Sequence, residues 1–214
     1  MKYLIKKPQK NNKDLAYFCG LILGDGSLPD AYSKRPNGQY QKRHIIHFAS
    51  QYLYFIKEVY KPLFIKLFGI KPRIVREIKY TNKILYICTI ESKELYNFLN
   101  KEIKINNGKK AKVARVSDII KKNYIYLLAG LLDTDGGKKG SGFGLSTASK
   151  ELADFCIDMF KKLNLSFHSC PWFYNNHYYH QIYVHKKDFH KLLKYIPLKN
   201  KEKTNYLKAY ASVA

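Results

Sequence analysis

Acidic residues are scarce in this sequence. Of its 214 residues, 16 are Asp or Glu and 39 are Lys or Arg, which gives a formal net charge of +23. Such an excess of positive charge indicates a polyanionic partner. Hydrophobic residues nevertheless make up 46% of the chain and aromatic residues 15%. A disordered basic tail is therefore excluded, and we expect a folded protein that buries a sizeable core.

Cysteine motifs and long apolar runs are also missing. Cys19, Cys88, Cys156 and Cys170 form no CxxC pair, so neither a zinc site nor a disulfide framework is expected, only reduced and mostly buried thiols. No stretch approaches the roughly 18 apolar residues that span a bilayer, and residues 1–8 lack the apolar stretch of a secretory signal. We expect a soluble intracellular protein, in the cytoplasm, the nucleoid or an organelle matrix.

An internal repeat divides the chain. Residues 14–26 (DLAYFCGLILGDG) match residues 123–136, which end in LAGLLDTDG, and Asp135 follows Asp25 by 135 − 25 = 110 positions. After each copy the pattern predicts a strand, a helix, two strands and a second helix. The sequence therefore predicts an α+β protein with two αββαββα halves, residues 1–106 and 123–214, joined by a basic linker at 107–122.

Periodicity and turn residues place the individual elements. In the first half we expect a strand at 39–48, a helix at 51–68 that Gly69 ends, a hairpin of 70–79 and 84–90, and a helix at 92–103. In the second half we expect a helix at 150–163, a hairpin of 165–174 and 178–185, and a last helix at 187–195.

The repeated helix carries the chemical argument. Gly20 and Gly24 are four residues apart and share one face, as do Gly130 and Thr134, so two such helices can pack closely side by side. Asp25 and Asp135 would then meet at the two C-terminal ends, where the helix dipoles and their mutual repulsion disfavour them. A hard divalent cation between them makes the arrangement favourable, and oxygen ligands of this kind suit Mg²⁺.

Residues 18–26 (FCGLILGDG) and 128–136 (LAGLLDTDG) resemble the signature of the LAGLIDADG homing endonucleases, in their single-chain, two-motif form. The second copy departs from the signature at Leu132 and Thr134. The first departs more, with Leu23 in place of the signature's earlier aspartate. The family's metal-binding acid is the later aspartate, here Asp25 and Asp135. The resemblance covers nearly the whole chain through the repeated element order.

This resemblance implies motif helices packed at the centre and two saddle-shaped antiparallel sheets that bind double-stranded DNA. It implies a monomeric, intron-encoded endonuclease without membrane or obligate protein partner, which hydrolyses one phosphodiester on each strand of a long asymmetric target and leaves staggered ends. Asp25 and Asp135 would bind Mg²⁺ with the backbone carbonyls of Gly24 and Thr134. Mn²⁺ would substitute, and Ca²⁺ would support binding without cleavage.

Such sites also use a basic residue that stabilises charge or orients water. Lys138 lies three residues after Asp135, and Lys201 lies in a lysine-bearing segment after the last predicted helix. In the first half, Lys109 or Lys110 would be the equivalent. An ordinary phosphate contact is the alternative role for each lysine.

Alternation along the predicted strands gives the residues expected to contact DNA, because one strand face carries Arg and Gln side chains that can bond base edges. In the first half these residues are Lys34, Arg35, Gln39, Gln41, Arg43, Lys71, Arg73 and Lys79; in the second half they are Lys139, His177, Tyr179 and Gln181.

Two other functions fit the same pattern. The chain could bind intron RNA as a splicing maturase, or it could be an inactive DNA-binding protein of the same fold. The paired acids favour cleavage over pure binding, because without a metal they only reduce stability.

Overall fold

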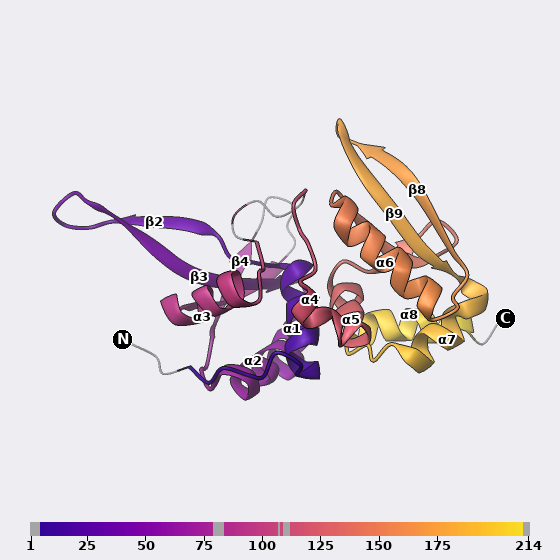
Figure 1. The fold of residues 1–214 in the computed structure, drawn as a ribbon, viewed down its shortest axis with the longest axis horizontal. Helices are drawn as coiled ribbons and strands as arrows, with labels where there is room; N and C mark the ends of the chain where they lie inside the picture. The colour runs from indigo at the N-terminus through magenta and orange to yellow at the C-terminus, as the bar shows by residue number, and fades with distance from the viewer. Residues whose placement is uncertain (1–4, 79–83, 107, 109–111, 212–214) are drawn as a thin grey trace.

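The computed structural model describes residues 5–78, 84–106, 108 and 112–211. Two halves lie side by side, each an antiparallel sheet with helices on one face, and the helices α1 (Lys13–Leu23) and α5 (Tyr124–Thr134) meet at the centre (Figure 1). The predicted α+β class, with motif helices at the centre of two related halves, is confirmed.

The first half follows the predicted order with a longer opening hairpin. After α1 come β1 (Gly26–Ser27), β2 (Asp30–Lys34), β3 (Tyr40–Ser50), the π-helical η1 (Phe55–Tyr60), α2 (Lys61–Phe68), β4 (Arg73–Ile78), β5 (Ile84–Glu91), α3 (Lys93–Asn97) and the π-helical η2 (Phe98–Glu102). The sheet order is β1-β3-β5-β4, and β2 pairs with the outer part of β3 in a hairpin that projects from the body (Figure 1).

Strand alternation decides which face of the first sheet is covered. Ile46 and Phe48 of β3 pair with Ile90 and Cys88 of β5, and all four side chains are buried under the helices. The intervening residues of the same strands therefore form an open face.

The second half repeats this arrangement. A short helix α4 (Asp118–Lys121) precedes α5, which is followed by β6 (Gly137–Lys139), β7 (Gly142–Thr147), α6 (Lys150–Lys162), β8 (Phe167–Tyr174), β9 (His177–His185), η3 (Lys186–Asp188), α7 (Phe189–Tyr195) and α8 (Lys201–Ala211). The sheet order is β6-β7-β9-β8. Asn175 and Asn176 both have positive φ, as a two-residue hairpin turn requires.

The close approach of α1 and α5 depends on two glycines. A Cβ atom added to Gly20 would lie 2.9 Å from the Gly130 Cα and would overlap the Leu127 carbonyl. A Cβ atom on Gly130 would lie 2.9 Å from the Gly20 Cα and would overlap the Tyr17 carbonyl. The two contacts are related by the 110-residue repeat, so the predicted glycine-mediated packing is confirmed.

Several segments differ from the sequence expectations. The helix expected from residue 51 begins later and opens in the π-helical η1, and the helix expected at 92–103 likewise ends in η2. The lysine-bearing segment beyond the last predicted helix contains a further helix, α8. The expected linker is partly folded into the body, because Ala114, Val116 and Ile120 are buried. The turn of the first predicted hairpin, at 80–83, lies outside the described residues.

The remaining general expectations concern the thiols and the membrane. Cys19, Cys88 and Cys156 are buried and Cys170 is half-buried, and all four are free thiols. Within the described ranges, no helix has the length and apolar character to cross a membrane.

Adding a methyl group at the central contact should destabilise the protein. We expect Gly130→Ala or Gly20→Ala to lower the free energy of unfolding by about 1–3 kcal/mol, because the new Cβ has no space between the two backbones. Urea unfolding measures this loss. Gly137→Ala is the control, because its Cβ would meet nothing within 4 Å. Equal effects at positions 130 and 137 would contradict close packing as the cause.

Candidate active site

The two motif aspartates lie at neighbouring helix ends. Asp25 follows the end of α1, where the Gly24 N–H donates to the Gly20 carbonyl at 3.0 Å, and Asp135 caps α5 by donating its N–H to the Leu131 carbonyl at 2.9 Å. A Cβ atom on Gly24 would lie 3.5 Å from the Asp135 Cγ and 2.6 Å from the Thr134 Cβ. The chain that carries Asp25 therefore touches the end of α5, as the repeat predicts.

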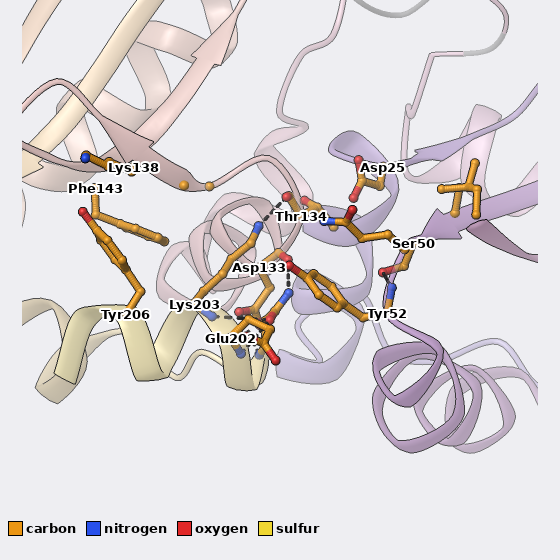
Figure 2. A pocket seen from close by; sticks show the side chains of 16 residues that line it. Asp25, Ser50, Tyr52, Asp133, Thr134, Lys138, Phe143, Glu202, Lys203 and Tyr206 are labelled. Carbon is orange, nitrogen blue, oxygen red and sulfur yellow. Dashed lines mark hydrogen bonds between the residues drawn. The ribbon is translucent and has the colours of Figure 1, made fainter. Parts of the chain in front are cut away.

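A cleft of about 670 Å³ opens at these helix ends, between the two halves. Asp25, Thr134 and Lys138 are expected site residues that line it, and Figure 2 shows Asp25 facing the Thr134 end of α5. Sequence reasoning missed several other polar residues of the lining: Ser50, Gln51, Asn200, Glu202 and Lys203. Ser50 is the last residue of β3, and Gln51 follows it.

Lys203 reaches furthest into the end of α5. Its Nζ donates to the Leu132 carbonyl at 3.0 Å and also to the Thr134 carbonyl (Figure 2). Burial lowers the pKa of Lys203 to about 8, against the opposing charges of Asp133, Asp25 and Asp135. The Lys203 ammonium interacts electrostatically with all three carboxylates, so it is placed to balance negative charge at this site.

The other expected lysines lie elsewhere. The Nζ of Lys201 forms an exposed ion pair with Glu58 at 2.7 Å and does not line the cleft. Lys109 and Lys110 lie outside the described residues. Lys201 and Lys203 are both in the first turn of α8, but their side chains leave the helix in different directions. The sequence did not predict this helix and so did not distinguish the two lysines.

Asp133 has a structural role that the sequence left unassigned. Its buried carboxylate accepts from the Tyr17 hydroxyl at 2.5 Å, the Lys199 N–H at 2.7 Å and the Asn200 N–H at 3.0 Å. Burial raises the pKa of Asp133, and these three donors oppose that rise. Asp133 therefore joins α5 to α1 and fixes the segment that leads into α8.

Asn200 extends this network to the first half. Its side-chain oxygen accepts from the Tyr54 hydroxyl at 2.9 Å and from the Glu202 N–H at 3.2 Å, and its amide donates to the Asp133 carbonyl at 3.1 Å. Asn200 thus caps α8 while it contacts both halves. These bonds position Lys203 at the cleft.

The sequence does contain a trace of this network. The counterparts of Tyr17 and Asp133 in the repeat are Leu127 and Leu23, both buried. The polar pair Tyr17 and Asp133 therefore corresponds to the apolar pair Leu127 and Leu23 in the repeat. In the first half, Leu23 replaces the earlier aspartate of the motif, and its side chain is part of the hydrophobic core.

The open face of the first sheet contains three of the eight residues expected to contact DNA in the first half. Gln41 and Arg43 point to this face, and Arg73 joins them because it pairs with Thr89, which pairs with His47. Lys34 pairs with Tyr40 and therefore points to the opposite face of the hairpin. Lys71, Arg35 and Gln39 are exposed in the flanking loops, and Lys79 lies outside the described residues.

Two of these side chains are held by internal contacts. Arg43 forms a two-pronged ion pair with Glu91, with Nη2 to Oε2 at 2.5 Å and Nε to Oε1 at 3.1 Å, and this hydrogen bonding lowers the pKa of Glu91. The Arg35 Nε donates to the Gln41 Oε1 at 2.8 Å. The ion pair thus fixes the Nε and Nη2 edge of the Arg43 guanidinium on the open face.

In the second sheet, His177, Tyr179 and Gln181 share the open face, as the alternation predicts. The Nζ of Lys139 lies 5.9 Å from the centre of the Trp172 ring. Trp172 was not among the expected contact residues, although it pairs directly with Tyr179.

The donor chemistry at the helix ends fits a hydrated divalent cation. Asp25 and Asp135 supply carboxylate oxygens, and Mg²⁺ in proteins commonly uses one or two carboxylates and keeps several waters. Of the two backbone carbonyls expected to complete the site, that of Thr134 accepts from Lys203. Among the described residues no group of three or more His, Cys, Asp or Glu side chains forms a closed metal cage.

Comparisons with known proteins agree with this geometry. Residues 122–197 match the family model of the LAGLIDADG-like domain. A search of curated protein sequences gave no match. Among solved structures, that of I-DmoI in complex with DNA and Ca superposes with a TM-score of 0.61 at 19% identity, and the match covers 92% of this chain and 97% of that one.

Two further homing endonucleases match over similar lengths. I-WcaI bound to its DNA recognition sequence gives a TM-score of 0.54 at 18% identity, covering 94% of this chain and 88% of that one. I-LtrWI bound to target DNA gives 0.56 at 14% identity, covering 94% and 89%. The predicted resemblance is confirmed at the level of the fold: the chain has the fold of these structures over most of its length, and residues 122–197 match the LAGLIDADG-like domain.

Removing one donor from the buried carboxylate should be costly. We expect Tyr17→Phe to lower the free energy of unfolding by about 1.5–3 kcal/mol, because Asp133 loses a hydrogen bond that burial makes irreplaceable. Thermal or urea unfolding measures the change.

Tyr206→Phe is the matched control for that substitution. The buried Tyr206 hydroxyl has no hydrogen-bond partner within the described part of the chain, so its removal should leave stability unchanged or slightly higher. If both variants lost stability equally, the bond to Asp133 would not be the source of the effect.

Proposed function

We propose that this protein is a site-specific, divalent-metal-dependent DNA endonuclease that hydrolyses one phosphodiester on each strand of an asymmetric duplex target and leaves staggered ends. The observation that carries the proposal is the pairing of Asp25 and Asp135 at the touching ends of α1 and α5. Two carboxylates at the negative ends of two helices oppose folding, so their pairing points to a ligand of opposite charge.

The two halves support a single duplex as substrate. Each half offers an open sheet face, and Asp25, at the touching ends of α1 and α5, lines the cleft between the halves (Figures 1 and 2). A duplex that follows both faces would cross the cleft in the middle of its length. Because the two halves differ in sequence, the two half-sites should differ too.

In the proposed reaction, water attacks the phosphorus, the bond to the leaving oxygen breaks, and a proton passes to that oxygen. Bound Mg²⁺ would supply Lewis-acid charge and a water of lowered pKa. Asp25 and Asp135 would hold the cation and orient the scissile phosphates. Lys203 and Lys138, which line the same cleft, would balance the charge that builds up on the phosphate oxygens.

Neutralising either acid should separate cleavage from binding. We expect Asp25→Asn and Asp135→Asn to lower the cleavage rate in Mg²⁺ by at least about 100-fold, because each removes a charge that acts on the transition state. Duplex binding in Ca²⁺ should remain. Incubation with a randomised duplex library, followed by sequencing of cleaved and bound fragments, measures both properties.

Asp154→Asn provides the control, since Asp154 is exposed on α6 and forms an ion pair with Lys150 at 2.7 Å. Its cleavage should equal that of the unchanged protein. Undiminished cleavage by the Asp25 and Asp135 variants would refute the proposed site. Selective binding without any cleavage by the unchanged protein would instead favour the inactive-binder function.

The lysine that serves the site can be identified by parallel substitutions. We expect Lys203→Met to slow cleavage by about tenfold or more, because its ammonium lies at the end of α5 beside the acids. Lys201→Met should have a smaller effect, because Lys201 pairs with Glu58 on the surface. Single-turnover rates with bound duplex test this order, and the reverse order would return the role to Lys201.

A further inference from the structure

The open face of the second sheet is built almost entirely from rings. We call it the aromatic face and define it by seven residues that point to one side of β8 and β9: His168, Trp172, Tyr174, His177, Tyr179, Tyr183 and His185. The opposite side of the same strands holds the buried Ile182 and Val184, so strand alternation assigns each side chain without ambiguity.

These rings form a connected layer. The Trp172 ring stacks on Tyr174 with centroids 5.4 Å apart and lies 5.8 Å from Tyr179. Tyr183 contacts His168 at 5.3 Å and His185 at 5.8 Å. Trp172 and Tyr174 keep 39% and 55% of their surface exposed. Exposed apolar patches of this kind mark interaction surfaces.

Glycines in β7 and in the turn before it make room for this layer. A Cβ atom on Gly142 would lie 2.7 Å from the Tyr183 Cδ2, and one on Gly140 would lie 2.9 Å from the Tyr183 hydroxyl. Tyr183 therefore lies over the backbone of β7, where larger residues would exclude it. Because glycines occupy these positions, the Tyr183 ring covers the backbone there.

Charged groups that read guanine or cytosine are few in the second sheet, and Lys139 is the one lysine or arginine that its described strands place on the open face. Its four strands contain no Arg, Asp or Glu, and their only cations are Lys138 and Lys139. Guanine is typically read by Arg or Lys, and cytosine by Asp or Glu. The first sheet differs, because Arg43, Arg73 and Glu91 all stand on its open face.

We propose that the aromatic face reads an A·T-rich half-site through contacts with thymine methyl groups, while the first sheet reads a half-site that contains guanine. This inference rests on the proposed function. The thymine methyl is the apolar group that the major groove displays, and ring contacts with it bury surface that is exposed in the free protein. Gln181, in the middle of the same face, can bond the adenine edge in two places.

Binding selection on a randomised duplex library in Ca²⁺ tests the inference. We expect one half of the enriched site to consist mainly of A·T pairs. Trp172→Ala should relax the thymine preference there by about fivefold or more and leave the other half unchanged. Arg43→Ala should relax a guanine preference in the other half only.

Phe173→Ala is the matched control, because Phe173 neighbours Trp172 and is 71% exposed but points to the opposite side of β8. Its selected site should be that of the unchanged protein. A second measurement avoids any effect of substitution on folding. Deoxyuridine in place of the affected thymines removes only the methyl groups, and it should weaken binding by the unchanged protein but not by Trp172→Ala.

The outcomes separate this inference from the proposed function. Selective duplex binding with guanine or cytosine at the positions that Trp172→Ala alters would overturn the inference alone. So would equal affinity for thymine and deoxyuridine sites. Preference for single-stranded RNA over duplex DNA would assign the rings to base stacking, and it would overturn both proposals.

Discussion

The contact between Gly20 and Gly130 is the constraint on which the rest of this structure depends. Backbone atoms of α1 and α5 approach so closely that neither position has room for a methyl group. This distance brings the ends of both helices together, and with them Asp25 and Asp135. It also sets the two sheets at a fixed separation, so one pair of glycines governs both the acid site and the spacing of the two open faces.

The two halves are related by a repeat, but their equivalent positions carry different side chains and make different contacts. On one side of the interface, Tyr17 and Asp133 form a buried hydrogen bond, and Leu127 and Leu23 occupy the matching positions. Asp133 also binds Asn200, at the start of α8. The helix α8 has no counterpart among the described elements of the first half. Lys203 therefore approaches the acid pair from one side only, which makes the candidate site asymmetric.

The same division extends to the sheets. The open face of the first sheet carries Arg43, Arg73 and Glu91, and an internal ion pair holds Arg43 in place. The second carries stacked rings and a single lysine, Lys139. Charged side chains act through directed hydrogen bonds, whereas rings act through burial of apolar surface. One chain thus presents two different chemistries to the two ends of its proposed target.

The sequence alone was enough for the parts that are local or periodic. The repeat, the glycine spacing, the paired acids, most strands and the Asn175-Asn176 turn depend on residues close together in the chain or on a fixed offset. Strand alternation likewise assigned Gln41 and Arg43 to the open face, because a period of two holds wherever one side is buried.

Only the tertiary structure decided which of the neighbouring groups reach the site. Lys203 rather than Lys201 lies beside the acids because α8, unrecognised in the sequence, turns one lysine inward and leaves the other on the surface. The role of Asp133 depends on donors from residues 17, 199 and 200, which are far apart along the chain. Such contacts depend on how packed elements face one another, and no local pattern in the chain contains that information.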